Sequence, residues 1–278
     1  LNFNQFFCFD KSFFRFIIIS NMIKLVDFFG SLEKEKVASL FEGQFPWEAL
    51  KKLKTFLNDI VPPIPKKIPV GCPLPETVLL TGEGEVIPLK DLEFEEEGYY
   101  FKGERVEGAI LMAGAFLGSE KIFFEKGVKV EPFAMIEGPA YFSQNTEIRQ
   151  GAYVRGSVYT GAGCVVGHTT EVKNSIFLAQ AKAAHFAYVG DSILGAQVNL
   201  GAGTKLANLK FNKKEIVLNI EGETIKTGLR KFGAILGDGC QTGCNSVLQP
   251  GTVLGKSSFV FPGRVAGPGF FGPFTKIK

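Results

Sequence analysis

The dominant pattern of apolar positions in this chain repeats every six residues between positions 130 and 260. Neither the 3.6-residue period of a helix nor the two-residue alternation of a strand gives such a series. Ten consecutive members are Val130, Ile136, Phe142, Ile148, Val154, Thr160, Val166, Val172, Leu178 and Ala184. After a slip the step resumes at Leu194, Leu200 and Leu206, and again at Leu236, Thr242, Leu248, Leu254 and Val260.

A step of six is typical of a parallel β-helix. Each hexad forms one short strand and one turn, three hexads close a triangular coil, and stacked coils bury the repeated aliphatic residue. Of the 33 glycines, 26 lie beyond residue 103, where they permit tight corners. We therefore expect an all-β fold with hexapeptide repeats over residues 104–278, interrupted by a polar excursion at residues 209–231. The flat faces of such a prism favour side-by-side association.

The chain before residue 104 follows other patterns and predicts a small α-rich N-terminal domain. Residues 22–61 read as helical, with one helix expected around residues 33–41 and a second marked by an apolar stripe. That stripe is Leu50, Leu53, Leu57 and Ile60. Six prolines between Pro62 and Pro75 predict an extended connector, and short strands complete the segment 62–103.

The first 21 residues are rich in phenylalanine and begin with Leu1 instead of methionine. We interpret residues 1–21 as an upstream leader or a misassigned start. A targeting segment and a docking strand or helix are the alternatives, although the apolar core is short for a signal peptide.

Composition excludes several classes of function. Lys and Arg number 31 against 28 Asp and Glu, so no basic field points to nucleic acid. No apolar run reaches the ~18–20 residues needed to span a membrane. Five cysteines, an odd number, do not indicate a disulfide framework, which favours the reducing cytoplasm.

Two segments carry a more specific motif, K-x-x-H-x-x-Y-x-G-D at residues 182–191 and N-x-G-A-G-T at residues 199–204. Over about residues 128–268 the chain resembles the acetyltransferase half of bifunctional N-acetylglucosamine-1-phosphate uridyltransferase/glucosamine-1-phosphate acetyltransferase. It is also similar to the C-terminal domains of archaeal sugar-1-phosphate nucleotidylyltransferases. The resemblance implies a left-handed β-helix, a homotrimer with active sites between subunits, and acetyl transfer from acetyl-CoA to an amino-sugar 1-phosphate.

The resemblance also assigns roles to matching positions. His185 stands at the general base, and the sugar and its phosphate are expected at Tyr188, Asn199, Arg155 and Lys173. Further acetyl-site positions are matched by Asn208 and Lys214. The CoA channel is expected along Ala202, Cys244 and Pro262.

The chemistry of the residues agrees with these roles. An ammonium has no lone pair, so amide formation needs a base that works near neutrality, and histidine suits that task. The developing oxyanion needs a donor, which a backbone N–H group near Gly201–Gly203 can supply. Arg155 and Lys173 are 18 residues apart, one coil, so they are expected to stack on one face and meet a phosphate.

Structural readings of the same residues stay open. His185 and His168 can be hydrogen-bonded residues of a coil corner, and His168 matches no catalytic role. Arg155 and Lys173 can be ordinary surface charges. Cys240 and Cys244 have the wrong spacing for a zinc knuckle and are expected to fill a coil, so no structural metal is predicted. Two histidines also cannot supply the three ligands of γ-type carbonic anhydrases, which share this architecture.

The sequence thus predicts an acetyl-CoA-dependent N-acyltransferase acting on an amino-sugar 1-phosphate or a nucleotide-linked amino sugar, in the UDP-N-acetylglucosamine pathway. The alternative is a non-catalytic trimeric protein that binds a sugar nucleotide or serves as a scaffold. Residues 1–127 contain no glycine-rich nucleotide-binding signature, so uridylyltransferase or pyrophosphorylase activity is not expected.

Overall fold

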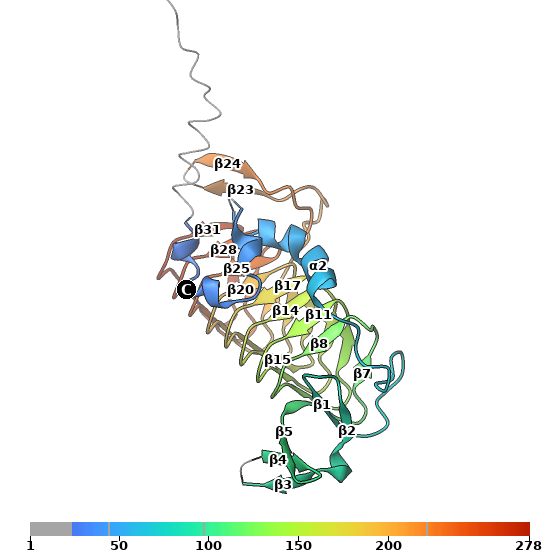
Figure 1. Cartoon of the computed structure of the whole chain (residues 1–278). Helices are drawn as coiled ribbons and strands as arrows, with labels where there is room; N and C mark the ends of the chain where they lie inside the picture. The colour runs from blue at the N-terminus through green and yellow to red at the C-terminus, as the bar shows by residue number, and fades with distance from the viewer. Residues whose placement is uncertain (1–23, 44, 97, 221) are drawn as a thin grey trace, which may run out of the picture.

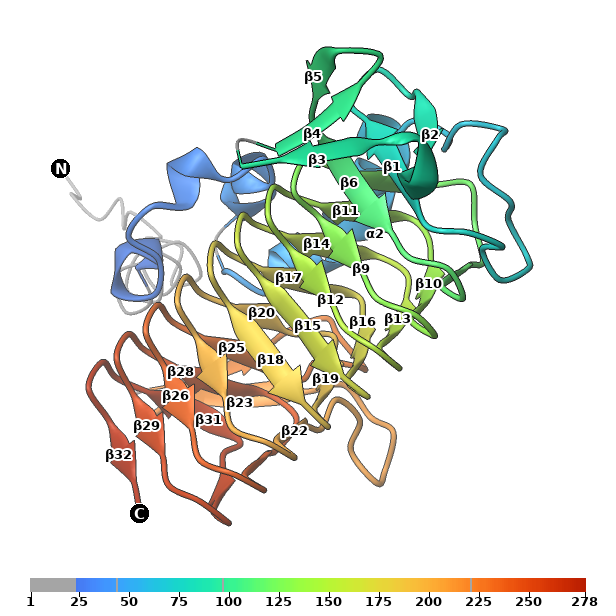
Figure 2. The same cartoon turned by 90° about the horizontal axis from the view of Figure 1, so that it is seen from below.

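A computed structural model describes residues 24–278 except residues 44, 97 and 221. The interpretation of residues 1–21 falls outside the described residues. From residue 108 onward the chain passes through three sheets in turn, and each coil contributes one short strand to each sheet. Figure 2 shows these coils stacked along the axis of an elongated prism. The predicted parallel β-helix is confirmed.

We call the three sheets wall 1, wall 2 and wall 3, in the order in which the chain meets them. Wall 1 contains β2 (Val86–Pro88), β1 (Val78–Thr81), β6 (Gly108–Leu111), β9 (Lys129–Val130), β12 (Glu147–Ile148), β15 (Val165–His168), β18 (Lys182–His185), β21 (Asn199–Leu200), β26 (Gln241–Thr242), β29 (Phe259–Val260) and β32 (Lys276–Ile277). Wall 2 contains β7 (Phe116–Leu117), β10 (Met135–Glu137), β13 (Tyr153–Arg155), β16 (Glu171–Lys173), β19 (Tyr188–Gly190), β22 (Lys205–Leu206), β27 (Val247–Leu248) and β30 (Val265–Ala266). Wall 3 contains β8 (Ile122–Phe124), β11 (Ala140–Phe142), β14 (Val158–Thr160), β17 (Ser175–Phe177), β20 (Ile193–Leu194), β25 (Ala234–Leu236), β28 (Thr252–Leu254) and β31 (Gly269–Phe271).

The main core is the interior of the prism, and the six-residue step predicts most of it. Val154 of β13 pairs in register with Val172 of β16, and both side chains are fully buried in one continuous cluster. The later positions Leu194, Leu236 and Leu254 belong to the same cluster. Burying each aliphatic side chain is worth roughly 1.5–3 kcal/mol, so stacking of coils is the main source of stability.

The predicted register is wrong at Leu178 and Ala184. The inward positions there are Phe177 and Ala183. The reason is a corner with one residue fewer, because β17 pairs with β14 at a spacing of 17 residues, whereas β14 pairs with β11 at a spacing of 18. Leu178 is still buried, but in an apolar layer on the outside of wall 3.

The N-terminal part of the described chain covers wall 3. Its α-helix, α2 (Glu48–Ile60), buries the predicted residues Leu50, Leu53 and Leu57, whereas Ile60 is exposed. The helix expected over residues 33–41 is wrong, since two 3₁₀ turns (Leu32–Lys34 and Ala38–Phe41) replace it. Another 3₁₀ turn precedes them at Leu25–Asp27. In Figure 1 these segments lie over the strands of wall 3.

The outer face of wall 3 is apolar, which explains the docking. The outward residues Tyr141, Tyr159, Ile176, Ile193, Ile235 and Val253 form one buried cluster with the N-terminal segment. Strands buried on both faces read as continuous apolar runs, such as Ala234–Leu236. This signal in the sequence marks wall 3 as a covered face.

A carboxylate fastens the N-terminal segment to the coils. Glu35 accepts hydrogen bonds from the Ala179 backbone N–H at 2.7 Å and from the Tyr159 hydroxyl at 2.9 Å. Burial raises the pKa of Glu35, partly opposed by the hydrogen bonds from Ala179 and Tyr159. Asp238 acts similarly, accepting from the backbone N–H groups of Gly30 (2.6 Å) and Ala196 (2.7 Å).

The remaining elements flank the prism. As predicted, short strands occupy residues 77–103. At one end of the prism, β3 (Glu93–Glu95), β4 (Gly98–Phe101) and β5 (Glu104–Val106) form a small antiparallel sheet (Figure 2). A 3₁₀ turn at Leu89–Asp91 precedes this sheet. The excursion forms an antiparallel hairpin of β23 (Val217–Ile220) and β24 (Glu223–Lys226), whose apolar residues join the layer on wall 3. None of the described helices is long and apolar enough to cross a membrane.

Candidate functional site

His185 lies at the corner between walls 1 and 2. It ends β18, pairs in register with His168 of β15, and has an exposed side chain. The corner is completed by Phe186, whose φ of +52° is the left-handed conformation and whose backbone N–H donates to the His168 carbonyl at 2.9 Å. A tight corner immediately after the strand therefore turns the His185 imidazole toward solvent, where it can meet a ligand.

The candidate CoA residues fall on the same corner as His185. Strand register places Ala202, Cys244 and Pro262 at the position of His185 on the three following coils. Backbone hydrogen bonds follow the same line: the carbonyl of each of His185, Ala202 and Cys244 accepts a bond from the coil above, at 3.0, 2.8 and 2.9 Å. With strands ~4.8 Å apart, this corner column extends about 14 Å from His185 to Pro262. Ala202 and Cys244 both carry small side chains at this corner.

The two cysteines of the C-x-x-x-C segment lie on opposite sides of the wall. Cys240 is buried inside the coil and its thiol donates to the Gly255 carbonyl at 3.1 Å, whereas Cys244 is exposed at the corner. The predicted coil-filling role is thus met by Cys240, and the pair is not arranged to share a metal ion. All four described cysteines are free thiols.

The structure narrows the expected oxyanion donors at residues 201–203 to one backbone N–H group. The Gly201 N–H already donates to the Thr242 carbonyl at 2.9 Å, and the Gly203 N–H donates to the His185 carbonyl at 3.0 Å. Neither group is available to an oxyanion. Of the three consecutive amides at this corner, that of Ala202 is the one for which the described residues supply no acceptor.

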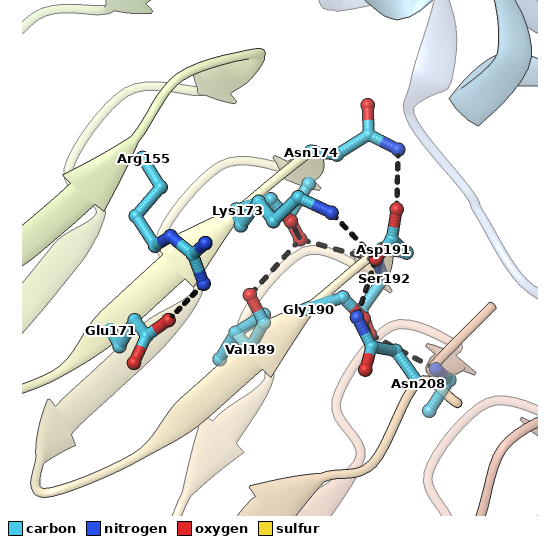
Figure 3. Close-up of polar contacts among 11 residues, drawn as sticks. Arg155, Glu171, Lys173, Asn174, Val189, Gly190, Asp191, Ser192 and Asn208 are labelled. Atoms are coloured by element: carbon cyan, nitrogen blue, oxygen red, sulfur yellow. Dashed lines mark hydrogen bonds and ion pairs between the residues drawn. The ribbon is translucent and has the colours of Figure 1, made fainter. Parts of the chain in front are cut away.

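Arg155 and Lys173 stack as predicted, but each already has a carboxylate partner. They occupy the same position of β13 and β16 on wall 2. Arg155 Nη1 lies 2.7 Å from Glu171 Oε1, and Lys173 Nζ lies 3.4 Å from Asp191 Oδ2 (Figure 3). The two cations therefore do not form a free positive patch. Both remain partly exposed, so N–H groups not used by the carboxylates can still reach a ligand.

Tyr188 and Asn208 meet above Gly190, next to these charges. A Cβ placed on Gly190 would lie 2.6 Å from the Tyr188 hydroxyl and 2.7 Å from Asn208 Nδ2, so only glycine leaves room for both groups. Burial, followed by the nearby carboxylates of Glu171 and Asp191, raises the pKa of Tyr188, which keeps the hydroxyl protonated as a donor. Asn208 Nδ2 also donates to Asp191 Oδ2 at 2.5 Å.

Asn199 and Lys214, two of the predicted site residues, lie apart from Arg155, Lys173 and Tyr188 within one chain. Asn199 lies on wall 1 between Lys182 and Gln241, and it lines a shallow polar pocket of about 250 Å³ with them. By strand geometry it is about 10 Å from the corner column. Lys214 is exposed in the excursion, and the hairpin that follows it packs on wall 3, away from the corner of His185.

Sequence reasoning missed the carboxylates of the cluster. The sequence assigned no role to Glu171, which pairs with Arg155, or to Asp191, which contacts Lys173 and Asn208. The Asn174 amide, which donates to Asp191, was also missed. A signal was present: Asp191 follows Lys173 by 18 residues, close to one coil. We call Arg155, Glu171, Lys173, Tyr188, Asp191 and Asn208 the wall 2 cluster.

The fold and this corner define a class: a parallel β-helix of hexapeptide coils that displays an exposed imidazole in line with small residues of the following coils. Residues 136–256 match the family model of the GMPPB C-terminal domain. This match lies within the region, about residues 128–268, over which the two motifs indicate a resemblance.

Curated relatives confirm the resemblance indicated by the two motifs for the C-terminal half of the chain. The bifunctional sugar-1-phosphate nucleotidylyltransferase/acetyltransferase of Sulfurisphaera tokodaii is 35% identical over 175 residues, covering 56% of this chain and 44% of the relative. The bifunctional protein GlmU of Methanococcus aeolicus is 33% identical over 172 residues, covering 62% of this chain and 39% of the relative. That of Methanocaldococcus jannaschii is 37% identical and covers 39% and 26%, respectively. The chain thus spans less than half the length of these relatives.

Among solved structures, the UDP-N-acetylglucosamine acyltransferase of Francisella novicida has a TM-score of 0.35 and 14% identity, covering 57% of this chain and 59% of that one. A score this low supports no argument.

Proposed function

We propose that the chain is an acetyl-CoA-dependent N-acyltransferase whose acceptor is an amino-sugar 1-phosphate or a nucleotide-linked amino sugar. The observation that carries this proposal is the corner column, in which the exposed His185 shares a line with Ala202, Cys244 and Pro262. The acetyltransferase named in the Sulfurisphaera relative supports the same reaction. A place in UDP-N-acetylglucosamine synthesis and a cytoplasmic location belong to the same proposal.

In this proposal His185 accepts the proton that the acceptor amine loses. The nitrogen lone pair forms the new C–N bond to the acetyl carbonyl carbon, the C–S bond breaks, and the sulfur leaves as the thiol or thiolate. Acetyl-CoA supplies the activated acetyl group. Stabilising the negative charge on the carbonyl oxygen falls to the Ala202 N–H, since the neighbouring amides are already bonded.

The wall 2 cluster is the proposed binding site of the acceptor's phosphate. Arg155 and Lys173 keep N–H donors that their carboxylate partners do not use, and the Tyr188 hydroxyl adds a neutral donor. The resemblance matches Asn208 to an acetyl-site position, but we assign its amide to the phosphate because it lies beside Tyr188 and Asp191. Because the carboxylates balance the two cations, specific geometry and not net charge must select the ligand.

We further propose that the working form is a homotrimer. Wall 3 is covered by this chain's own N-terminal segment and hairpin, so walls 1 and 2 are the faces left for neighbours. Asn199 on wall 1 and the wall 2 cluster face different directions in one prism. Packing wall 1 of one copy beside wall 2 of another would bring Asn199, and Lys214 at the end of its loop, toward a shared cleft.

The test is release of thiol from acetyl-CoA with glucosamine 1-phosphate and other amino-sugar phosphates as acceptors, together with the mass of the assembly by light scattering. Turnover by a trimer supports the proposal. A trimer that binds sugar nucleotides but releases no thiol with any acceptor would favour the non-catalytic alternative, and a monomer would overturn the shared cleft. UTP-dependent release of pyrophosphate is not expected.

A further inference from the structure

Asp191 is a buried carboxylate at the corner between walls 2 and 3. Asp191 directly follows β19, is 5% exposed, and adopts a φ of +48°. Removing a carboxylate from water is costly unless both oxygens find partners. Donors therefore have to be supplied by the side chains around it.

Three side chains from two coils donate to Asp191, since Lys173 and Asn174 are consecutive residues and Asn208 lies on a later coil. Oδ1 accepts from Asn174 Nδ2 at 2.9 Å, and Oδ2 accepts from Asn208 Nδ2 at 2.5 Å and from Lys173 Nζ at 3.4 Å (Figure 3). All three contacts are made by N–H groups, which can only donate. The side chain between them must therefore accept hydrogen bonds on both of its terminal atoms. A carboxylate meets that requirement and an amide does not.

The backbone of the same residue fastens the end of the excursion. The Asp191 carbonyl accepts from the Gly233 N–H at 2.8 Å, and the Asn208 carbonyl accepts from the Phe232 N–H at 2.9 Å. The chain leaves the coil at Asn208 and returns at Gly233, so both ends of the excursion meet at Asp191. The position of Asn208, and of the Tyr188 hydroxyl beside it above Gly190, depends on this junction.

Asp191 also separates the two cations of wall 2. Arg155 and Lys173 are neighbours on successive coils, about 4.8 Å apart at the backbone, and like charges at that distance repel each other. Glu171 holds Arg155, while Asp191 draws the Lys173 ammonium toward the other edge of the wall. The result is two fixed cations with donors free on the same face.

We propose that Asp191 is a positioning residue: it holds Lys173 and Asn208 where they contact the phosphate of the acceptor, without touching the acceptor itself. This inference rests on the proposed function of the wall 2 cluster. It predicts that loss of the Asp191 charge weakens binding of the acceptor and leaves the acetyl-transfer step at His185 almost unchanged.

The first experiment compares Asp191→Asn with the wild-type chain. We expect the KM for glucosamine 1-phosphate to rise tenfold or more, with kcat and the KM for acetyl-CoA changed by less than about threefold, the pattern of lost binding. The matched control is Asp238→Asn, because Asp238 is also a bonded carboxylate at a corner but accepts only from backbone N–H groups near the N-terminal segment. The control should lower thermal stability and leave both KM values unchanged. A KM for the acceptor that stays at the wild-type value in Asp191→Asn would overturn the proposal.

The second experiment asks whether Asp191 acts through Lys173. In a double-mutant cycle with Lys173→Met, the double variant should lose clearly less affinity for glucosamine 1-phosphate, measured by calorimetry, than the sum of the two single losses, because Asp191 acts in part through Lys173. Any loss beyond that of Lys173→Met alone is the part that acts through Asn208. Fully additive losses would show that Asp191 acts independently of Lys173 and would contradict the proposal. Because calorimetry needs no turnover, a wild-type chain that binds the sugar phosphate but releases no thiol rejects the acetyltransferase and still tests Asp191. A wild-type chain with no binding rejects both.

Discussion

His168 and His185 occupy the same position on successive coils, but only His168 is tied to the coil. The His168 Nδ1 donates to the Gln150 carbonyl at 3.0 Å, and the ring meets Phe186 edge-on at a centroid distance of 5.3 Å. The His185 ring has no hydrogen-bond partner among the described residues, and its centroid is 6.4 Å from that of Phe186. The two imidazoles therefore form a natural pair for separating catalysis from structure.

His185→Ala is expected to lower kcat for acetyl transfer by about 10²–10⁴-fold, the usual contribution of a general base. His168→Ala should change kcat by less than about threefold, although its lost hydrogen bond lowers stability. Thiol release from acetyl-CoA measures both. Equal losses in the two variants would contradict a catalytic role for His185.

Gly190→Ala is expected to displace the Tyr188 hydroxyl and the Asn208 amide, since the new methyl group would lie within 2.7 Å of both. We expect the KM for the acceptor to rise about tenfold, equivalent to ~1.4 kcal/mol. Thermal stability should change little, because the Tyr188 side chain can swing outward.

The control for Gly190→Ala is Gly272→Ala, where the added methyl group meets nothing within 4 Å. Neither glycine has a positive φ, so alanine is compatible with both backbones. If Gly272→Ala changes the KM as much as Gly190→Ala, the space above Gly190 is not part of the acceptor site.

Glu35 gives the docking of the N-terminal segment a pH dependence. Burial raises the pKa of Glu35 above its ordinary value of 4.5, so the folded chain holds this proton more tightly than the unfolded chain. The contribution to stability is then fully present below pH 4.5 and is lost as the pH rises through the raised pKa.

Glu35→Gln keeps an acceptor for the Ala179 N–H and removes the charge. It should raise the midpoint of thermal unfolding at pH 8 by no more than about 2–4 °C, since the side chain is partly solvated. The advantage over the wild-type chain should shrink toward pH 4. A variant that is less stable than the wild-type chain at pH 8 would show that the hydrogen bonds of the carboxylate outweigh its burial.

Leu53→Ala tests whether the N-terminal segment and the prism unfold together. Leu53 is 0% exposed in the layer between α2 and wall 3, so the truncation is expected to cost about 2–5 kcal/mol. Lys54→Ala on the exposed side of α2 should stay within ~0.5 kcal/mol. One cooperative calorimetric transition at a lower temperature is the expected result, and an unchanged main transition with a separate early one would indicate independent docking.

The sequence predicts the β-helix because its order is local and repeated. Each aliphatic residue from Val130 to Val172 points inward for the same reason as its neighbour six residues away, and stacking then follows from identical coils. The same regularity places His185, Ala202, Cys244 and Pro262 near one another, since the motif spacing already contains the coil length.

Only the tertiary structure decides features that depend on contacts between distant segments. The short corner that brings Phe177 inward is hidden in the sequence, because Leu178 is equally apolar and is buried on the other side of the wall. The partners of Arg155 and Lys173 are hidden too, since a carboxylate sixteen or eighteen residues away pairs only when the coils set the distance. The repeated sequence pattern determines the coil shape that all hexads share. Contacts between distant segments decide where a corner is shorter, which wall is covered, and which charges pair.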